Sequence, residues 1–99
     1  MKLSEKVYKK LLEVPKGKVT TYRDLAEAVG LKNGQRAIGR IMNQNQYPVI
    51  IPCHRVVKSD GNIGGYSYGK DVKITLLSKE GIKIKNEKIS NFEKSIYRF

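Results

Sequence analysis

Two short amphipathic segments separated by a tight turn restrict the fold more than any other feature of this sequence. In "VTTYRDLAEAVG", Thr21 is a typical N-cap with Asp24 three residues further on, and Gly30 is a typical helix stop. After the turn "LKNG", the segment "QRAIGRIMNQN" has the spacing of a second helix, with one apolar face formed by Ala37, Ile38, Ile41 and Met42. Short helices joined through a glycine-containing turn predict a helix-turn-helix, whose second helix can enter a DNA groove.

The opposite face of the second helix is polar and carries Arg36, Gly39, Arg40 and Asn43. Two arginines and an asparagine suit contact with nucleic acid, and a glycine would let the backbone approach a ligand closely. A glycine inside a helix costs about 1 kcal/mol relative to alanine, which favours a role for this one. An ordinary solvated helix face is the alternative, because many small helical pairs bind nothing.

Further segments complete a mainly α-helical prediction. The spacing of apolar residues predicts a helix over residues 4–14 and a last helix over "KDVKITLLSKEG" that stops at Gly81. Between them, "KSDGNIGGYSYG" predicts a turn at Asp60–Gly61 and a short wing hairpin. The predicted fold is therefore a small winged helix-turn-helix-like domain over residues 1–81. Residues 82–99 are expected to form a C-terminal extension, either a packed tail or a partly disordered one.

The composition indicates which partners and environments to expect. With 99 residues, 39% of them apolar and 29% charged, the chain fits one soluble domain. It has no apolar run of the roughly 20 residues that cross a bilayer and no secretory signal. We therefore expect an intracellular protein of the cytoplasm or nucleoid, with no membrane partner. The formal charge of +11 favours a polyanionic partner, and a lysine-rich soluble surface is the alternative.

The stretch "VIIPCHRVV" holds the only cysteine and the only histidine side by side, as Cys53 and His54. One residue of each type is too few for a disulfide or a typical zinc site, so no metal or cofactor is expected. Pro48 and Pro52 exclude a continuous helix, and the apolar run predicts that Cys53 lies at or just under the surface. An inert buried thiol and a nucleophile both remain open from these residues alone. Adjacent residues of an extended segment point to opposite faces, so His54 needs a bend or a bridging water to act on the thiol.

The last predicted helix offers a partner for His54. Leu76 and Leu77 mark its buried face, and Glu80 follows three or four residues later on that face. An inward-facing carboxylate needs a partner, and a hydrogen bond to the histidine would fix the tautomer of the ring. The spacing therefore permits a relay of Cys53 as nucleophile, His54 as base and Glu80 as orienting carboxylate.

Four motifs give the chain a resemblance to a known family. "VPKGKVTTY", "RAIGRIMNQN", "IPCHRVV" and "GGYSYG" resemble, in order and spacing, the C-terminal DNA-binding domain of the O6-alkylguanine-DNA alkyltransferases, also called methylated-DNA–protein-cysteine methyltransferases. The resemblance extends to about Gly81. It implies a monomeric DNA repair enzyme that transfers the alkyl group of O6-alkylguanine in double-stranded DNA to its own cysteine, once per chain. Most members carry a further domain before the equivalent of Ser4, which this sequence does not show, and we expect the chemistry to lie wholly in the matching part.

The resemblance also implies roles for individual residues. Cys53 is the alkyl acceptor, His54 the base that takes the thiol proton through a water, and Glu80 the carboxylate that orients His54. The target guanine must leave the base stack before its O6 can be reached. Arg36 then fills the vacated place in the duplex, and Tyr22 donates to guanine N3 and contacts the neighbouring phosphate.

Other positions of the family pattern are matched singly. The small residues Ala37 and Gly39 allow the recognition helix, with Arg40 on the same polar surface, to approach the minor groove closely. Asn45 braces the turn before the active-site segment, and Arg55 is structural or directed at a phosphate. Two backbone carbonyls accept from the guanine amine and two loop residues close over the base: respectively Cys53 and Val56, and Tyr66 and Ser67.

Two other functions remain as alternatives. The first is a non-catalytic relative that binds and flips alkylguanine to mark it for excision repair. Such relatives lack the cysteine and usually have tryptophan there, so Cys53 argues against this function. The second is a winged-helix regulator, for which the helix-turn-helix and the charge are sufficient but the Pro-Cys-His-Arg segment has no purpose.

Overall fold

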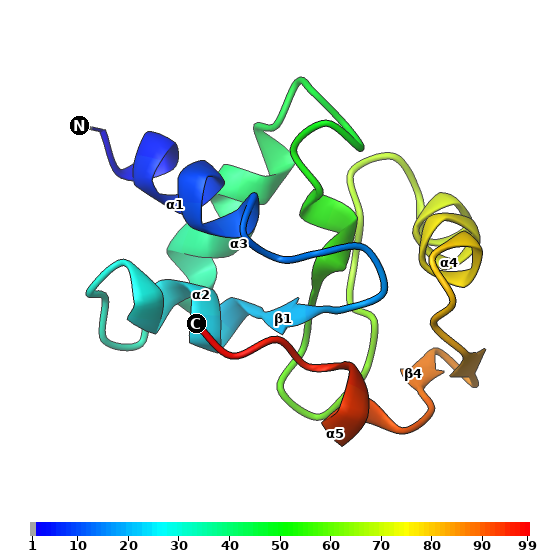
Figure 1. Cartoon of the computed structure of the whole chain (residues 1–99). Coiled ribbons are helices and arrows are strands. Elements are labelled where there is room, and N and C mark those ends of the chain that lie inside the picture. The colour runs from blue at the N-terminus through cyan, green and yellow to red at the C-terminus, as the bar shows by residue number, and fades with distance from the viewer. Residues whose placement is uncertain (1) are drawn as a thin grey trace.

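Residues 2–99, the part of the chain that the computed structural model describes, contain five α-helices and two small two-stranded sheets (Figure 1). The helices are α1 (Leu3–Leu11), α2 (Tyr22–Ala28), α3 (Gln35–Asn43), α4 (Lys70–Lys79) and α5 (Phe92–Ser95), with a 3-10 turn η1 (Cys53–Arg55). The strands are β1 (Thr20–Thr21), β2 (Val56–Val57), β3 (Ile84–Lys85) and β4 (Lys88–Ile89). The mainly α-helical prediction is confirmed. Within these residues, no helix is both long and apolar enough to span a membrane.

Helices α2 and α3 form the predicted helix-turn-helix. The Thr21 hydroxyl accepts a hydrogen bond from the Asp24 amide at 2.9 Å, as expected of an N-cap. Gly34 directly precedes α3, and a Cβ added to it would lie 2.7 Å from the Cβ of Leu31. Any larger residue would therefore have to move this turn, which explains why a glycine stands between the two helices.

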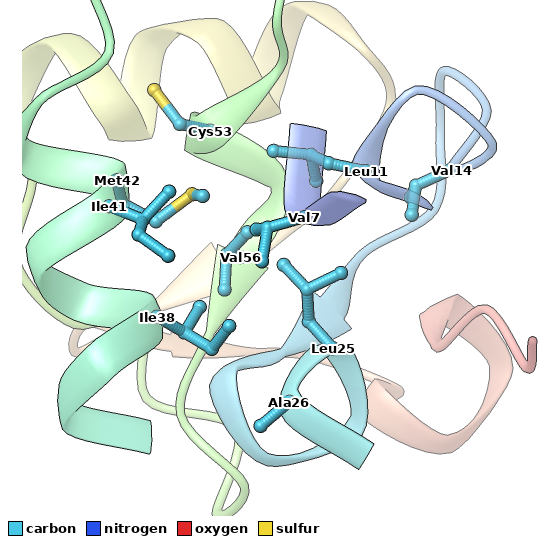
Figure 2. Close-up of a cluster of buried hydrophobic side chains, with 10 residues drawn as sticks. All are labelled: Val7, Leu11, Val14, Leu25, Ala26, Ile38, Ile41, Met42, Cys53 and Val56. Carbon is cyan, nitrogen blue, oxygen red and sulfur yellow. The ribbon is translucent and has the colours of Figure 1, made fainter. Parts of the chain in front are cut away.

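The main hydrophobic core lies between α1, α2, α3 and the segment that contains η1 (Figure 2). Helix α1 ends at Leu11 and not at the predicted residue 14, because Pro15 disfavours helical backbone at the residue before it. Val14 is still buried, so its apolar spacing indicated the core correctly but not the helix end. The buried cluster consists of Val7, Leu11, Val14, Leu25, Ala26, Ile38, Ile41, Met42, Cys53 and Val56.

The wing differs from the predicted hairpin. The turn at Asp60–Gly61 is present, and Gly61 has a φ of +89°, which favours glycine. Across the turn, the Lys58 amide donates to the Asn62 carbonyl at 2.9 Å, but the bonds do not extend into a pair of strands. Asn62 forms an antiparallel bridge with Lys88 of β4 as well. The wing is therefore completed by the C-terminal extension, which a local pattern could not indicate.

The C-terminal extension, residues 82–99, folds against the rest of the domain. Strands β3 and β4 form an antiparallel hairpin, and α5 follows. The chain then runs beside β1, where the Val19 amide donates to the Ser95 carbonyl at 2.8 Å and the Tyr97 amide donates to the Val19 carbonyl at 2.7 Å. Figure 1 shows this segment in orange and red, ending near α2. It contributes to a second buried cluster of Val19, Val57, Ile63, Leu77, Ile82 and Ile89.

Candidate active site

Cys53 is the first residue of η1 and directly follows Pro52, so the backbone bends at the cysteine. Its side chain belongs to the core cluster and is 3% exposed. The side-chain amide of Asn45 donates to Sγ at 3.2 Å. Figure 2 shows Cys53 at the edge of the cluster, with its sulfur directed away from Val7 and Val56. Apolar packing and one polar donor therefore fix the position of the thiol.

His54 is fully buried, and its Nε2 lies 3.0 Å from Oε2 of Glu80, the C-cap residue of α4. An ionised carboxylate only accepts hydrogen bonds, so Nε2 carries the hydrogen and Nδ1 has the free lone pair. Nδ1 is buried and has no hydrogen-bond partner within residues 2–99. Glu80 thus orients a ring whose second nitrogen is available to accept a proton.

The surroundings keep His54 neutral and Glu80 ionised. Burial is the largest influence on His54 and lowers its pKa; the hydrogen bond to Glu80 opposes this, while the charges of Arg55 and Lys73 add to it. Burial alone would raise the pKa of Glu80, but hydrogen bonds from Arg55 and His54, together with their charges, lower it overall. A neutral histidine beside an ionised carboxylate is the state that a general base requires.

Arg55 binds the same carboxylate through two hydrogen bonds. Its Nε donates to Oε1 of Glu80 at 2.9 Å, and its Nη2 donates to Oε2 at 2.7 Å. Its Nη1 donates to the Val14 carbonyl at 2.9 Å. Of the two roles expected for Arg55, these contacts favour the structural one, because its donors are used inside the fold.

Asn45 is buried and connects the loop after α3 with the cysteine segment. Its Nδ2 also donates to the Ile51 carbonyl at 3.0 Å, and its Oδ1 accepts from the Tyr47 amide at 2.9 Å. The Tyr68 hydroxyl donates to the Asn45 carbonyl at 3.0 Å, and the Tyr68 ring lies 5.5 Å from that of Tyr66. One asparagine thus links the end of the recognition helix, the thiol and the loop before α4.

A cavity of about 450 Å³ lies between α3 and the wing, in the size range of sites for small ligands. Burial, followed by the charge of Cys53, raises the pKa of Tyr22 and of Tyr66, so both hydroxyls keep their protons and can donate. The cavity is lined by Tyr22, Gln35, Arg36, Gly39, Asn43, Lys58, Ser59, Gly65 and Tyr66.

Lys73 is a candidate site residue that the sequence analysis did not single out. It is fully buried on α4, and its Nζ donates to the Val56 carbonyl at 2.7 Å and to the Gly65 carbonyl at 3.0 Å. Burial lowers its pKa to about 8, against the opposing effect of Cys53. The Val56 carbonyl, expected to accept from the guanine amine, is thus already an acceptor and has only its second lone pair free. Position 73 lies one helical turn before Leu77, and that spacing was the one available signal.

The predicted site residues fall into two groups, and a few lie apart. The first group, Cys53, His54 and the partly buried Glu80, does not line the cavity. Cys53 nevertheless raises the pKa of two lining residues, Tyr22 and Tyr66. The lining group contains Tyr22, Arg36, Gly39 and Tyr66. Of the others, Ala37 is half-buried on α3, and Arg40 and Ser67 are exposed beyond the lining. Lining residues that were missed, Gln35, Lys58 and Ser59, have no spacing that separates them from ordinary surface residues.

The fold and the site together define a helix-turn-helix domain whose second helix and wing border a cavity, with a buried cysteine followed in the chain by a buried histidine. The chain belongs to the family described as 6-O-methylguanine DNA methyltransferase, DNA binding domain, whose model matches residues 2–82. It is 52% identical over 71 residues to a methylated-DNA–protein-cysteine methyltransferase of Pyrobaculum aerophilum. The matched region covers 72% of this chain and 47% of that protein. The chain spans about half the length, or less, of the curated relatives that it matches.

Two solved structures extend the comparison. The O6-methylguanine-DNA methyltransferase of Pyrococcus kodakaraensis is 46% identical with a TM-score of 0.75, over 83% of this chain and 47% of that one. S. pombe Atl1, in complex with damaged DNA containing O6-carboxymethylguanine, is 30% identical with a TM-score of 0.88 over 100% of both chains. The match with Atl1 therefore includes the C-terminal extension.

Proposed function

We propose that this protein repairs DNA by transferring the alkyl group of O6-alkylguanine to Cys53, once per chain. The observation that carries the proposal is the residue that follows Cys53 in the chain: a buried, neutral His54 whose Nε2 is held by Glu80 at 3.0 Å. An inert buried cysteine needs no such neighbour. The substrate class is taken from relatives such as the P. aerophilum methylated-DNA–protein-cysteine methyltransferase.

In the proposed mechanism, Nδ1 of His54 takes the thiol proton of Cys53 through a water, and Glu80 stabilises the resulting imidazolium. The thiolate attacks the alkyl carbon, so a carbon–sulfur bond forms while the bond from that carbon to O6 breaks and its electron pair passes to the guanine. The Tyr22 hydroxyl gives a proton to guanine N3, which makes the departing base neutral. The proton on His54 then restores the tyrosine through solvent. The thioether is stable, so each chain reacts once.

We further propose that α3 binds the minor groove and that the target nucleotide is flipped into the cavity. Arg36 lines the cavity with an exposed side chain, which suits it to fill the vacated place in the duplex. No atom lies within 4 Å of a Cβ added at Gly39, so this part of α3 is open to a ligand; Ala37 and Arg40 belong to the same helix. The cavity and the thiol belong to one chain, so a monomer is sufficient for the proposed reaction. No step of it requires a cofactor, and its substrate, DNA, implies a protein inside the cell.

Residues 1–81 would form the catalytic domain in this proposal, and residues 82–99 a tail packed on it. The match of the family model to residues 2–82 supports this division. So do the buried tail residues Ile82 and Ile89, which join the second core cluster.

A second candidate function is lesion binding without transfer. The observation that favours it is the match over the whole of both chains with S. pombe Atl1, whose structure holds DNA containing O6-carboxymethylguanine. Transfer explains more of this chain, because lesion binding alone requires no cysteine at position 53.

Mass spectrometry separates the two candidates. The protein is incubated with a duplex that contains O6-methylguanine, and its peptides are analysed. Transfer predicts the added mass of one methyl group on the peptide with Cys53, never more than one per chain. The Cys53→Ser variant is the matched control and should bind the duplex without gaining the mass. Tight binding of the duplex by the wild-type protein with Cys53 unmodified would replace transfer by lesion binding.

A further inference from the structure

The β3–β4 hairpin carries two lysines that no carboxylate neutralises. Lys85 and Lys88 are directly opposite each other in the register of the hairpin, and both are exposed. None of the ion pairs within residues 2–99 includes either of them. Like charges placed opposite each other destabilise a pair of strands. This arrangement costs stability in the free protein, and an anion bound to both lysines would remove that cost.

Backbone hydrogen bonds attach this hairpin to the wing. The Ile63 amide donates to the Glu87 carbonyl at 2.9 Å, and the Ile89 amide donates to the Gly61 carbonyl at the same distance. Asn62 lies between these two bonds and bridges to Lys88. The hairpin is therefore a continuation of the wing by two further strands and not a separate appendage.

The tip of the hairpin is bonded to the start of α4. Glu87 at the tip accepts from Nζ of Lys70 at 2.6 Å, and Lys70 is the first residue of α4. Just before α4 lies the loop that supplies Tyr66 to the cavity lining. Lys58 of the wing lines the same cavity together with Arg36 of the recognition helix. The wing that supplies Lys58 to the cavity is thus the segment to which the basic hairpin is bonded.

We propose that Lys85 and Lys88 bind backbone phosphates of the same DNA duplex, next to the stretch that α3 contacts. The hairpin acts as a second wing that adds affinity without reading sequence. Along each strand of a duplex a phosphate recurs about every 3.4 Å of helix axis. Two flexible lysines on adjacent strands of a hairpin can therefore reach neighbouring phosphates. The S. pombe Atl1 structure, which matches the whole chain with the extension included, contains DNA. The inference rests on the proposed DNA binding but not on alkyl transfer.

The test is the salt dependence of binding to an undamaged duplex of about 20 base pairs, in which each phosphate contact contributes a slope of about 0.9. The double variant Lys85→Gln/Lys88→Gln is compared with Lys6→Gln/Lys9→Gln, which removes the same charge from exposed positions on α1. We expect the slope of log K against log salt to fall by about 1.8 for the hairpin variant and to stay unchanged for the α1 variant. Equal slopes for the two variants would overturn the proposal.

A second measurement uses the wild-type protein and does not depend on whether the variants fold. An amine-acylating reagent is applied with and without the duplex, and the modified lysines are identified by peptide mass spectrometry. Bound DNA should protect Lys85 and Lys88 but not Lys6 and Lys9, and unprotected hairpin lysines would contradict the proposal. Neither experiment involves methylated DNA, so failed alkyl transfer and failed phosphate binding by the hairpin remain distinguishable.

Discussion

Lys73 is fully buried, so its charge is costly for the fold. Its Nζ lies in the interior between the carbonyls of Val56 and Gly65, and burial lowers its pKa from the ordinary 10.5 to about 8. Between these two values the unfolded chain still binds a proton that the folded chain has released. The stability of the fold therefore rises with pH through this window, since stability increases wherever the unfolded state binds more protons.

We expect the free energy of unfolding of the wild-type protein to gain on the order of 1 kcal/mol from Lys73 between pH 8 and 9.5. The Lys73→Met variant has no ionisable group at this position and should lose the gain. Urea denaturation across this pH range measures it. The Lys73→Arg variant stays charged in both states, so its profile should lack the same rise. Cys53 is present in all three proteins, and identical profiles would show that Lys73 does not titrate in this window.

At the level of elements, α3 contains a glycine that packing does not require. A Cβ added to Gly39 meets no atom within 4 Å, yet glycine is a poor helix former. Packing does require glycine at Gly34, where the Cβ would lie 2.7 Å from Leu31. The two glycines therefore serve different purposes. Gly34 permits the tight turn between α2 and α3, and Gly39 leaves the surface of α3 open to a ligand.

The Gly39→Ala substitution should raise the free energy of unfolding by up to about 1 kcal/mol, because alanine favours the helix and finds open space. It should weaken binding of a duplex, because the added methyl group keeps the backbone of α3 away from the groove. Urea denaturation and a fluorescence binding assay measure the two effects. Lower stability would point to a packing role for Gly39, and unchanged binding would remove Gly39 from the proposed interface.

Elements that depend on local sequence were predictable, and those that depend on distant pairing were not. The start of α3 and the cap at Thr21 follow from spacing and from one side-chain hydrogen bond three residues away. The contact of His54 with Glu80 could be predicted because a buried carboxylate needs a partner. Lys73 was missed because a lysine in a helix normally extends its charged end into water. The wing is joined to β4 by a single bridge between Asn62 and Lys88, far apart in the chain, so no periodicity marks this pairing.

At the scale of the whole molecule, the C-terminal extension is part of the core. Ile82 and Ile89 are buried, and Tyr97 is hydrogen-bonded to Val19 beside β1. The extension thus covers the side of β1 that β2 leaves free. The fold depends on its last residues in the same way as on any other core segment.

Deletion of residues 86–99 should lower the melting temperature by about 10 °C or more. Burial of one isoleucine such as Ile89 contributes about 1.5–3 kcal/mol, and in a domain of this size 1 kcal/mol corresponds to roughly 4–8 °C. Circular dichroism on heating gives the value. Deletion of residues 98–99 alone keeps Ile89 and the bonds to Val19, so it should shift the melting temperature far less. If the variant without residues 86–99 had the same melting temperature as the wild-type protein, the extension would contribute nothing to stability.

The pairing of Val19 with Tyr97 also determines when a newly made chain can finish folding. Val19 is synthesised well before Tyr97, so the backbone edge at Val19, next to β1, stays unpaired until residue 97 has left the ribosome. Contacts between residues this far apart in sequence slow folding, and an open strand edge is a site for aggregation. The helix-turn-helix and the segment that contains Cys53 can fold before this pairing is made. The time between their formation and the arrival of residues 95–97 is an interval in which the open edge exposes the nascent chain to aggregation.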